Sequence, residues 1–156
     1  MCEIACSLKH EGKVWPEASR IRVFELVPGI DVPHLCAQCL DHPCVKACPV
    51  DALYFDEKIM AVKVREEKCT GCGACIEACP GEVPRIPDGK KSVVICDLCD
   101  GDPECVKVCS QAGYNALSLI ERVDSKYDYS VYARKPEDIT RDLVQKVYRL
   151  KPEEVL

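Results

Sequence analysis

The chain has little of the apolar material from which a domain of its size normally builds a core. Of its 156 residues only two are Phe and one is Trp, and 14 Cys inflate the hydrophobic share of 47 %. No run approaches the roughly 18 apolar residues of a membrane span, and residues 1–20 lack the apolar stretch of a signal peptide. We therefore expect a cytoplasmic chain without a membrane span, held together by more than side-chain burial.

An excess of basic residues is also missing. The 21 Lys and Arg stand against 26 Asp and Glu, and the net charge of −5 argues against a nucleic-acid partner. No G-x-G-x-x-G or P-loop pattern supports nucleotide binding, and no Ser/His/Asp set has a suggestive context. The paired carboxylates Glu66-Glu67 and Glu153-Glu154 are typical of surface charge. We expect no catalytic residue in this chain.

Cysteine is abundant, and it falls into four groups. The first is a stub of two, Cys2 and Cys6. The second has the spacing C-x2-C-x4-C-x3-C-P and comprises Cys36, Cys39, Cys44 and Cys48. The third has the spacing C-x2-C-x2-C-x3-C-P and comprises Cys69, Cys72, Cys75 and Cys79. The fourth has the spacing C-x2-C-x5-C-x3-C, ends before Ser110 instead of a proline, and comprises Cys96, Cys99, Cys105 and Cys109.

The spacing discriminates between disulfides, zinc and iron–sulfur clusters. Disulfides need an oxidising compartment, and no export signal is present. The third group matches the bacterial ferredoxin run, in which three thiolates hold one 4Fe–4S cluster and the fourth ligates its neighbour. Gly71 and Gly73 allow the tight loop that this requires, whereas zinc usually takes two separated C-x2-C pairs. The prediction is 4Fe–4S clusters; a metal-stapled structural or binding module is the alternative.

An internal repeat supports a ferredoxin-like unit. The segment Cys44–Cys48 recurs almost unchanged as Cys105–Cys109, and the β-leaning runs 52–55 and 116–120 follow the two copies. In the first copy, residues 59–64 complete a hairpin. We predict a unit made of a ligand loop, a one-turn helix carrying the last Cys, and a hairpin strand, with two units packed around two clusters.

The order of the Cys groups resembles that of four-cluster ferredoxin-type electron-transfer subunits, which serve molybdenum and tungsten pterin oxidoreductases. The resemblance runs from Cys2 to about Ile120 and includes the segments 2–12 and 19–23. The short length and residues 96–105 are most similar to the small subunit of tungsten aldehyde oxidoreductases.

The resemblance implies an α+β fold of tandem ferredoxin-like modules, one inserted into the other. Residues 1–35 and 91–120 would form the first module, 36–90 the inserted module, and 121–156 a C-terminal extension with a docking helix. It also implies three ligand sets: Cys36, Cys39 and Cys44 with Cys79; Cys69, Cys72 and Cys75 with Cys48; Cys96, Cys99 and Cys105 with Cys6.

Only Cys2 and Cys109 remain for the fourth cluster, for which such subunits supply four ligands. Two further cysteines would precede Cys2, where this sequence has only Met1. We therefore expect three or four clusters. Either the natural chain begins earlier, or the fourth cluster is absent or is completed by His10, Asp97 or a partner residue.

Several one-electron centres in a small chain form a relay rather than a catalyst. The resemblance implies a larger catalytic subunit as partner, with a flavin subunit, a soluble ferredoxin or another copy of the chain as the second carrier. A freestanding polyferredoxin is the other possibility of this class.

The C-terminal segment has no Cys and predicts a helix. Pro136 suits the first helical position, and the helix would run to about Arg149. An apolar stripe along it comprises Ile139, Leu143, Val147 and Leu150. We expect it to pack on the domain or to dock on a partner.

Overall fold

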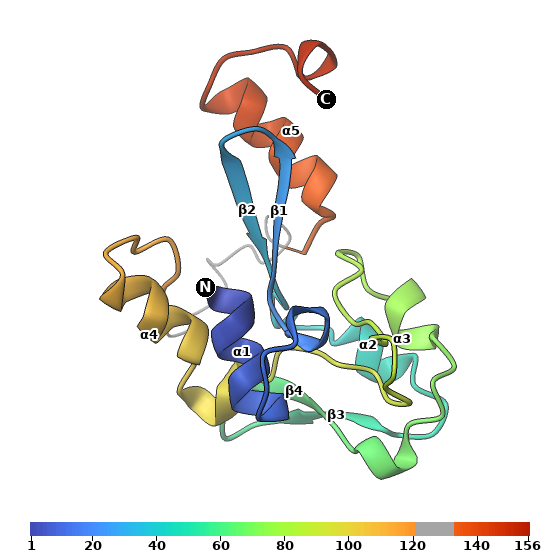
Figure 1. The fold of residues 1–156 in the computed structure, drawn as a ribbon. Coiled ribbons are helices and arrows are strands. Elements are labelled where there is room, and N and C mark those ends of the chain that lie inside the picture. The colour runs from blue at the N-terminus through green and yellow to red at the C-terminus, as the bar shows by residue number, and fades with distance from the viewer. Residues whose placement is uncertain (121–132) are drawn as a thin grey trace.

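The computed structural model describes residues 1–120 and 133–156 and has a mixed α+β architecture (Figure 1). The helices are α1 (Cys2–Glu11), α2 (Pro43–Lys46), α3 (Ala74–Glu77), α4 (Glu104–Gln111) and α5 (Pro136–Lys146). The strands are β1 (Arg22–Val27), β2 (Ile30–His34), β3 (Leu53–Asp56) and β4 (Ala61–Val64). Short 3-10 turns occur at Pro16–Ala18, Glu66–Lys68, Leu98–Gly101 and Pro152–Glu154.

Residues 121–132, the predicted start of the C-terminal extension, lie outside the described residues. Within the two described ranges, no helix combines the length and the apolar character needed to cross a membrane.

The hairpin predicted after the second Cys group is confirmed by β3 and β4. The strands pair antiparallel, with Leu53 opposite Val64 and Asp56 opposite Ala61. Their inner face belongs to an apolar cluster that also contains Val93, Ile95 and the thiols of Cys44 and Cys75. Among the described residues, no aromatic side chain is fully buried, so this core consists of small aliphatic groups and sulfur.

The second half of the predicted repeat differs from the first. Residues 116–120 form no strand, so that prediction is wrong. The Ala116 N–H donates to the Cys109 sulfur at 3.2 Å, and a thiol thus takes a backbone donor that a strand partner would otherwise use. The helices also depart from the prediction: Cys48 lies just past the end of α2, whereas the longer α4 contains both Cys105 and Cys109.

The helix predicted from Pro136 is confirmed as α5, although it ends at Lys146 and not near Arg149. It lies across the β1–β2 hairpin (Figure 1). Val144 is fully buried there against Val27, Ile30 and Val32 of the hairpin. The predicted packing of this helix on its own domain is therefore observed, while Val147 remains 64 % exposed.

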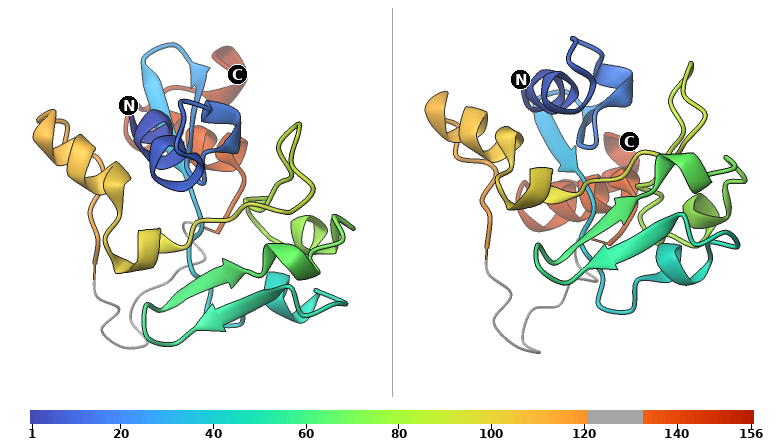
Figure 2. Two further views of the ribbon diagram at one scale, coloured as in Figure 1. Left: turned by 60° about the horizontal axis from the view of Figure 1, so that its bottom comes forward. Right: turned by 90° about the horizontal axis from the view of Figure 1, so that it is seen from below.

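Helix α1 packs along α4, although the two are far apart in the sequence (Figures 1 and 2). Helix α1 ends at Glu11 and is capped by Gly12. The φ of Gly12 is 69°, the left-handed conformation that glycine adopts readily, and its N–H donates to the Leu8 carbonyl. The seam between α1 and α4 brings the N-terminal Cys stub to the fourth Cys group.

Candidate metal centres

Four Cys from two different sequence groups line one cavity, which we call site 1. They are Cys36, Cys39, Cys44 and Cys79. The space between these side chains is about 370 Å³ with its solvent-open part included, and its other walls include the apolar side chains of Val62 and Ile95. Two backbone N–H groups point at its sulfurs: Gln38 N–H donates to Cys36 Sγ at 3.4 Å and Val83 N–H to Cys79 Sγ at 3.5 Å.

A second cavity, site 2, has the complementary composition. Its Cys are Cys48, Cys69, Cys72 and Cys75, and its space is about 300 Å³ with the solvent-open part included. Ala52 N–H donates to Cys48 Sγ at 3.2 Å and Val93 N–H to Cys69 Sγ at 3.5 Å. Each of the two groups therefore places three Cys at one site and its last Cys at the other, because α2 and α3 lie side by side.

The loop between Cys69 and Cys75 depends on its two glycines. Gly71 and Gly73 have φ values of 71° and 81°, where side chains with a Cβ are strained. A Cβ on Gly71 would also lie 3.1 Å from the Lys91 carbonyl oxygen. The tight loop that exposes three thiols to one cavity therefore needs glycine at this point.

The separation of the sulfurs distinguishes a cluster from a single zinc ion. A tetrahedral zinc site with bonds of about 2.3 Å holds its sulfurs about 3.8 Å apart. Throughout residues 1–120 and 133–156, no three thiol groups approach within 4.8 Å of one another; the one set of possible ligand atoms that meets this limit is that of His10, Asp97 and Cys99. Sites 1 and 2 thus have the donor set and the room for a polynuclear cluster.

Burial favours the neutral, protonated form of the thiols at these sites. It raises the pKa of Cys44 to about 12 and that of Cys75 to about 11, and neighbouring Cys side chains add to both shifts. Metal ions would reverse this preference, since a coordinating thiol loses its proton. Metal binding at sites 1 and 2 would therefore release protons and would be coupled to folding.

A third set of thiols, site 3, lies at the seam of α1 and α4. It comprises Cys6, Cys96, Cys99 and Cys105, all buried. Cys6 and Cys105 pack in one apolar cluster with Ile21. Burial, followed by the proximity of Cys6 and Cys99, raises the pKa of Cys105 to about 12. The four predicted residues are thus brought together by α1, α4 and the loop before α4.

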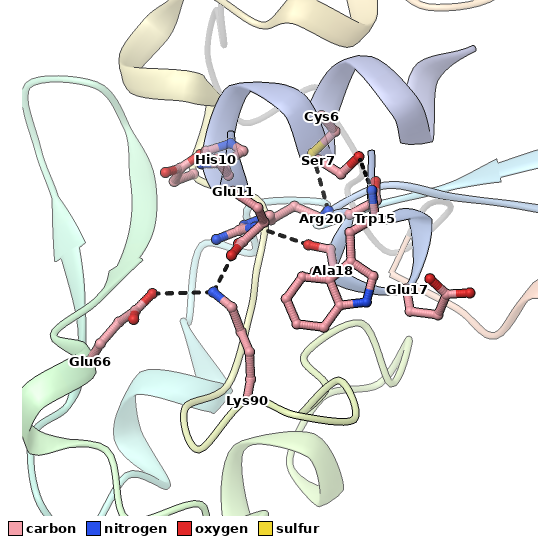
Figure 3. A network of polar contacts seen from close by, with 12 residues as sticks. Cys6, Ser7, His10, Glu11, Trp15, Glu17, Ala18, Arg20, Glu66 and Lys90 are labelled. Carbon is pink, nitrogen blue, oxygen red and sulfur yellow. Dashed lines mark hydrogen bonds and ion pairs between the residues drawn. The ribbon is translucent and has the colours of Figure 1, made fainter. Parts of the chain in front are cut away.

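Cys6 differs electrostatically from the other thiols of site 3. Burial by itself would raise its pKa, but hydrogen bonds from the His10 side chain and the Arg20 N–H outweigh this effect and lower it. The Arg20 N–H lies 3.1 Å from Cys6 Sγ (Figure 3). Loss of the thiol proton is therefore easier at Cys6 than at Cys105.

His10 was considered from the sequence only as a substitute ligand for a fourth cluster. Its Nε2 lies 3.5 Å from Cys99 Sγ and 3.4 Å from Asp97 Oδ1. Hydrogen bonds with Cys6 and Cys99 raise its pKa to about 9, and the charge of Asp97 contributes. The spacing of Cys6 and His10, four residues apart on one helix, is the sequence signal for the contact between these two side chains.

The three sites form a row. Cys96 of site 3 lies close enough to Cys36 of site 1 for their charges to interact. The same holds for Cys44 of site 1 and Cys75 of site 2. The Gln38 side chain joins the first pair, because its Nε2 donates to the Cys96 carbonyl at 2.8 Å and its Oε1 accepts from the Val62 N–H at 3.0 Å.

The two remaining Cys lie one helical turn farther along the same seam. Cys2 packs against the Cys6–Cys105 cluster. Cys109 is buried, and its sulfur accepts the Ala116 N–H. His10, in contrast, lies two turns of α1 away from Cys2, beside Cys99. A fourth cluster held by Cys2 and Cys109 stays a prediction.

Known proteins are similar in sequence to this chain. Residues 29–80 match the model of the 4Fe-4S dicluster domain. A Pyrococcus furiosus protein, the polyferredoxin-like subunit of aliphatic sulfonate oxidoreductase, is 58 % identical over 148 residues, which cover 95 % of this chain and 85 % of that subunit. An uncharacterized ferredoxin of Methanocaldococcus jannaschii is 34 % identical over 131 residues, 83 % of this chain and 72 % of that protein.

The formate dehydrogenase iron–sulfur subunit of Wolinella succinogenes is 33 % identical over 113 residues, 66 % of this chain and 55 % of that subunit. The cysteine sites and these relatives define a ferredoxin-type protein that binds several 4Fe–4S clusters. The chain belongs to the family of polyferredoxin-like subunits and is an iron–sulfur electron-transfer subunit.

Proposed function

We propose that sites 1, 2 and 3 each hold one 4Fe–4S cluster. Each cluster would exchange one electron. The ligands would be Cys36, Cys39, Cys44 and Cys79 at site 1; Cys48, Cys69, Cys72 and Cys75 at site 2; Cys6, Cys96, Cys99 and Cys105 at site 3. The observation that carries this proposal is the presence of two cavities, each lined by four Cys with crossed origins.

The row of sites supports a relay through the molecule. In this proposal electrons pass along the order site 2, site 1, site 3, since Cys44 adjoins Cys75 and Cys36 adjoins Cys96. The protein's own contribution is to keep neighbouring sites close together, to bury them in apolar surroundings and to place N–H donors at their sulfurs.

The module arrangement is part of the proposal. Residues 1–35 and 91–120 form one ferredoxin-like module, and residues 36–90 are inserted into it. The packing of α1 along α4 supports this division, because it joins the two ends of the outer module. The family match over residues 29–80 covers most of the inserted module.

The partner in this proposal is the catalytic subunit of an oxidoreductase that contains a tungsten or molybdenum pterin. The names of the relatives, an aliphatic sulfonate oxidoreductase and formate dehydrogenases, support a catalytic partner. The substrate of that catalytic subunit would be an aldehyde if the family resemblance holds. It would be an aliphatic sulfonate by analogy with the Pyrococcus furiosus relative.

The test is anaerobic purification of the native protein with its partners, followed by measurement of iron, sulfide and zinc per chain. About twelve irons with equal sulfide are expected for three clusters, and about sixteen would add a fourth at Cys2 and Cys109. Tungsten or molybdenum in the co-purifying subunit would support the proposed partner. Zinc without labile sulfide would refute the relay.

A further inference from the structure

Site 3 differs from the other sites in having a side-chain nitrogen at its sulfurs. His10 lies one turn after Cys6 on α1 (Figure 3), and its Nε2 is 3.5 Å from Cys99 Sγ. It also hydrogen-bonds to the Cys6 side chain. One imidazole thus contacts two of the four thiols from which site 3 is built, and only 13 % of its side chain is exposed.

Asp97 holds both partners of this contact in place. Its Oδ1 accepts the Cys99 N–H at 2.9 Å and lies 3.4 Å from His10 Nε2. The loop that follows is strained, because Leu98, Cys99 and Asp100 have φ values of 56°, 50° and 60° without being glycine. The carboxylate therefore fixes a backbone conformation that turns the Cys99 sulfur toward the imidazole.

The sulfurs of sites 1 and 2 have different donors. The hydrogen bonds given above for Cys36, Cys79, Cys48 and Cys69 all come from backbone N–H groups. A backbone donor remains when a side chain is changed. Site 3 has, besides the Arg20 backbone N–H at Cys6, a donor that belongs to one replaceable side chain, His10. Hydrogen bonds to the sulfurs of a cluster raise its reduction potential, because they stabilise the added negative charge.

We propose that His10 is a positioning residue that raises the reduction potential of site 3 by donating its Nε2–H to the sulfur of Cys99 and by its hydrogen bond with Cys6, with Asp97 orienting the imidazole. The proposal rests on the proposed function, since it requires a cluster at site 3. The reaction concerned is the uptake of one electron by that cluster from an external reductant, without a bond made or broken in His10.

The experiment is a redox titration of the anaerobically purified holoprotein, in which the signal of each reduced cluster is followed by electron paramagnetic resonance. Cys99→Ser identifies the signal of site 3. In His10→Leu we expect unchanged iron and sulfide, and a roughly tenfold lower equilibrium constant for reduction of that cluster, which is about 59 mV for one electron. The potentials of the other two clusters remain unchanged.

Three further variants test the mechanism. His10→Gln retains an N–H donor and recovers part of the loss. Asp97→Asn keeps the oxygen that accepts the Cys99 N–H and faces the imidazole, but removes a negative charge beside the sulfurs, so the potential of site 3 rises. Lys9→Gln is the matched control, because Lys9 is exposed on the same helix and touches no sulfur in the contacts given above. We expect it to shift the potential of site 3 much less than His10→Leu does.

Two results would overturn the proposal. Full iron with an unchanged site 3 potential in His10→Leu would show that the hydrogen bond has no influence. Loss of about four irons from both His10 variants would make His10 a ligand and not a donor. A wild-type protein with no third cluster would instead refute the proposed function, and the iron content separates that failure from the other two.

Discussion

The inserted module that we propose, residues 36–90, and the seam of α1 and α4 build similar sets of four thiols by different means. In the inserted module, sites 1 and 2 arise from two compact motifs whose first and last Cys are 12 and 10 residues apart in the sequence, and apolar side chains line the cavities. At the seam, site 3 combines Cys6 with residues 96–105 and depends on long-range packing and on polar side chains.

This difference shows how a chain with few large apolar side chains can hold distant segments together. A buried ion network connects the seam to the inserted module: Glu11 binds Arg20 and Lys90, and Lys90 also approaches Glu66 at 3.7 Å (Figure 3). Arg85 adds hydrogen bonds to the carbonyls of Glu17 and Ser19. Local motifs suffice at sites 1 and 2, whereas site 3 needs this scaffold.

The largest effect is expected from loss of a thiol in the inserted module. Cys72→Ala removes the most exposed of the ligands proposed for site 2, so about four irons per chain should be lost and thermal stability should fall sharply. Iron analysis and anaerobic thermal unfolding measure both. Full retention of iron and sulfide would contradict the ligand assignment at that site.

A smaller effect, confined to the seam, is expected for Glu11→Gln. Neutralising this carboxylate removes the ion-pair partner of the partly buried Arg20 and leaves Lys90 only its longer contact with Glu66, so the free energy of unfolding should fall by about 2 kcal/mol. The matched control is Glu66→Gln, whose side chain is 60 % exposed and whose loss should cost at most about 0.5 kcal/mol. Equal losses in anaerobic urea unfolding would contradict a special role for the buried network.

The Glu11 carboxylate also predicts that the free energy of unfolding depends on pH. Burial would raise the pKa of Glu11, but hydrogen bonds from Lys90 and Arg20 outweigh burial and hold it below its usual 4.5. A lowered pKa means that the stabilisation is present above pH 4.5 and is lost as the pH falls through the lowered value. Wild type and Glu11→Gln should therefore converge in stability under acid, where the seam loses its scaffold.

Substitutions of two glycines at site 2 distinguish the destabilisation due to backbone strain from that due to a close contact. Both Gly71→Ala and Gly73→Ala place a Cβ at positive φ and should cost about 1–2 kcal/mol. Gly71→Ala should cost more, because its Cβ meets the Lys91 carbonyl, whereas a Cβ on Gly73 meets nothing within 4 Å. Thermal unfolding and the rate of iron loss measure the difference; a larger loss in Gly73→Ala would refute the contact argument.

The smallest effect is expected from Cys2→Ala. If the seam holds one cluster only, iron content and the spectra of all clusters should remain unchanged, and Ser110→Ala should behave identically. Loss of about four irons from Cys2→Ala would show that a fourth cluster lies next to site 3. The seam would then carry two clusters, as the inserted module does in our proposal.

Much of the local structure could be predicted from short patterns. The hairpin of β3 and β4 and the start of α5 at Pro136 follow from alternation and capping rules that act over a few residues. The strand expected at residues 116–120 was wrong, because it was inferred from a repeat whose second copy uses its backbone to bond the Cys109 sulfur. Repetition of sequence did not ensure repetition of backbone pairing.

The predicted sites show the same division. The crossed sharing of Cys between the second and third groups came from a family resemblance, and the structure places those Cys in two common cavities. The contact of His10 with Cys99 spans 89 residues, so no spacing rule could have identified it. His10 and Asp97 were named from the sequence only as substitute ligands for a fourth cluster, and their contact with each other is equally long-range.

The sequence by itself determined the chemistry: fourteen thiols in ferredoxin-like spacing, too few apolar groups for an ordinary core, and glycines where a ligand loop must turn. Only the tertiary structure decided which distant residues meet: α1 beside α4, α5 across the β1–β2 hairpin, and His10 against the sulfurs of site 3. The reason is physical. Ligand loops are governed by sterics over a few bonds, whereas long-range contacts depend on the burial and charge of the whole fold.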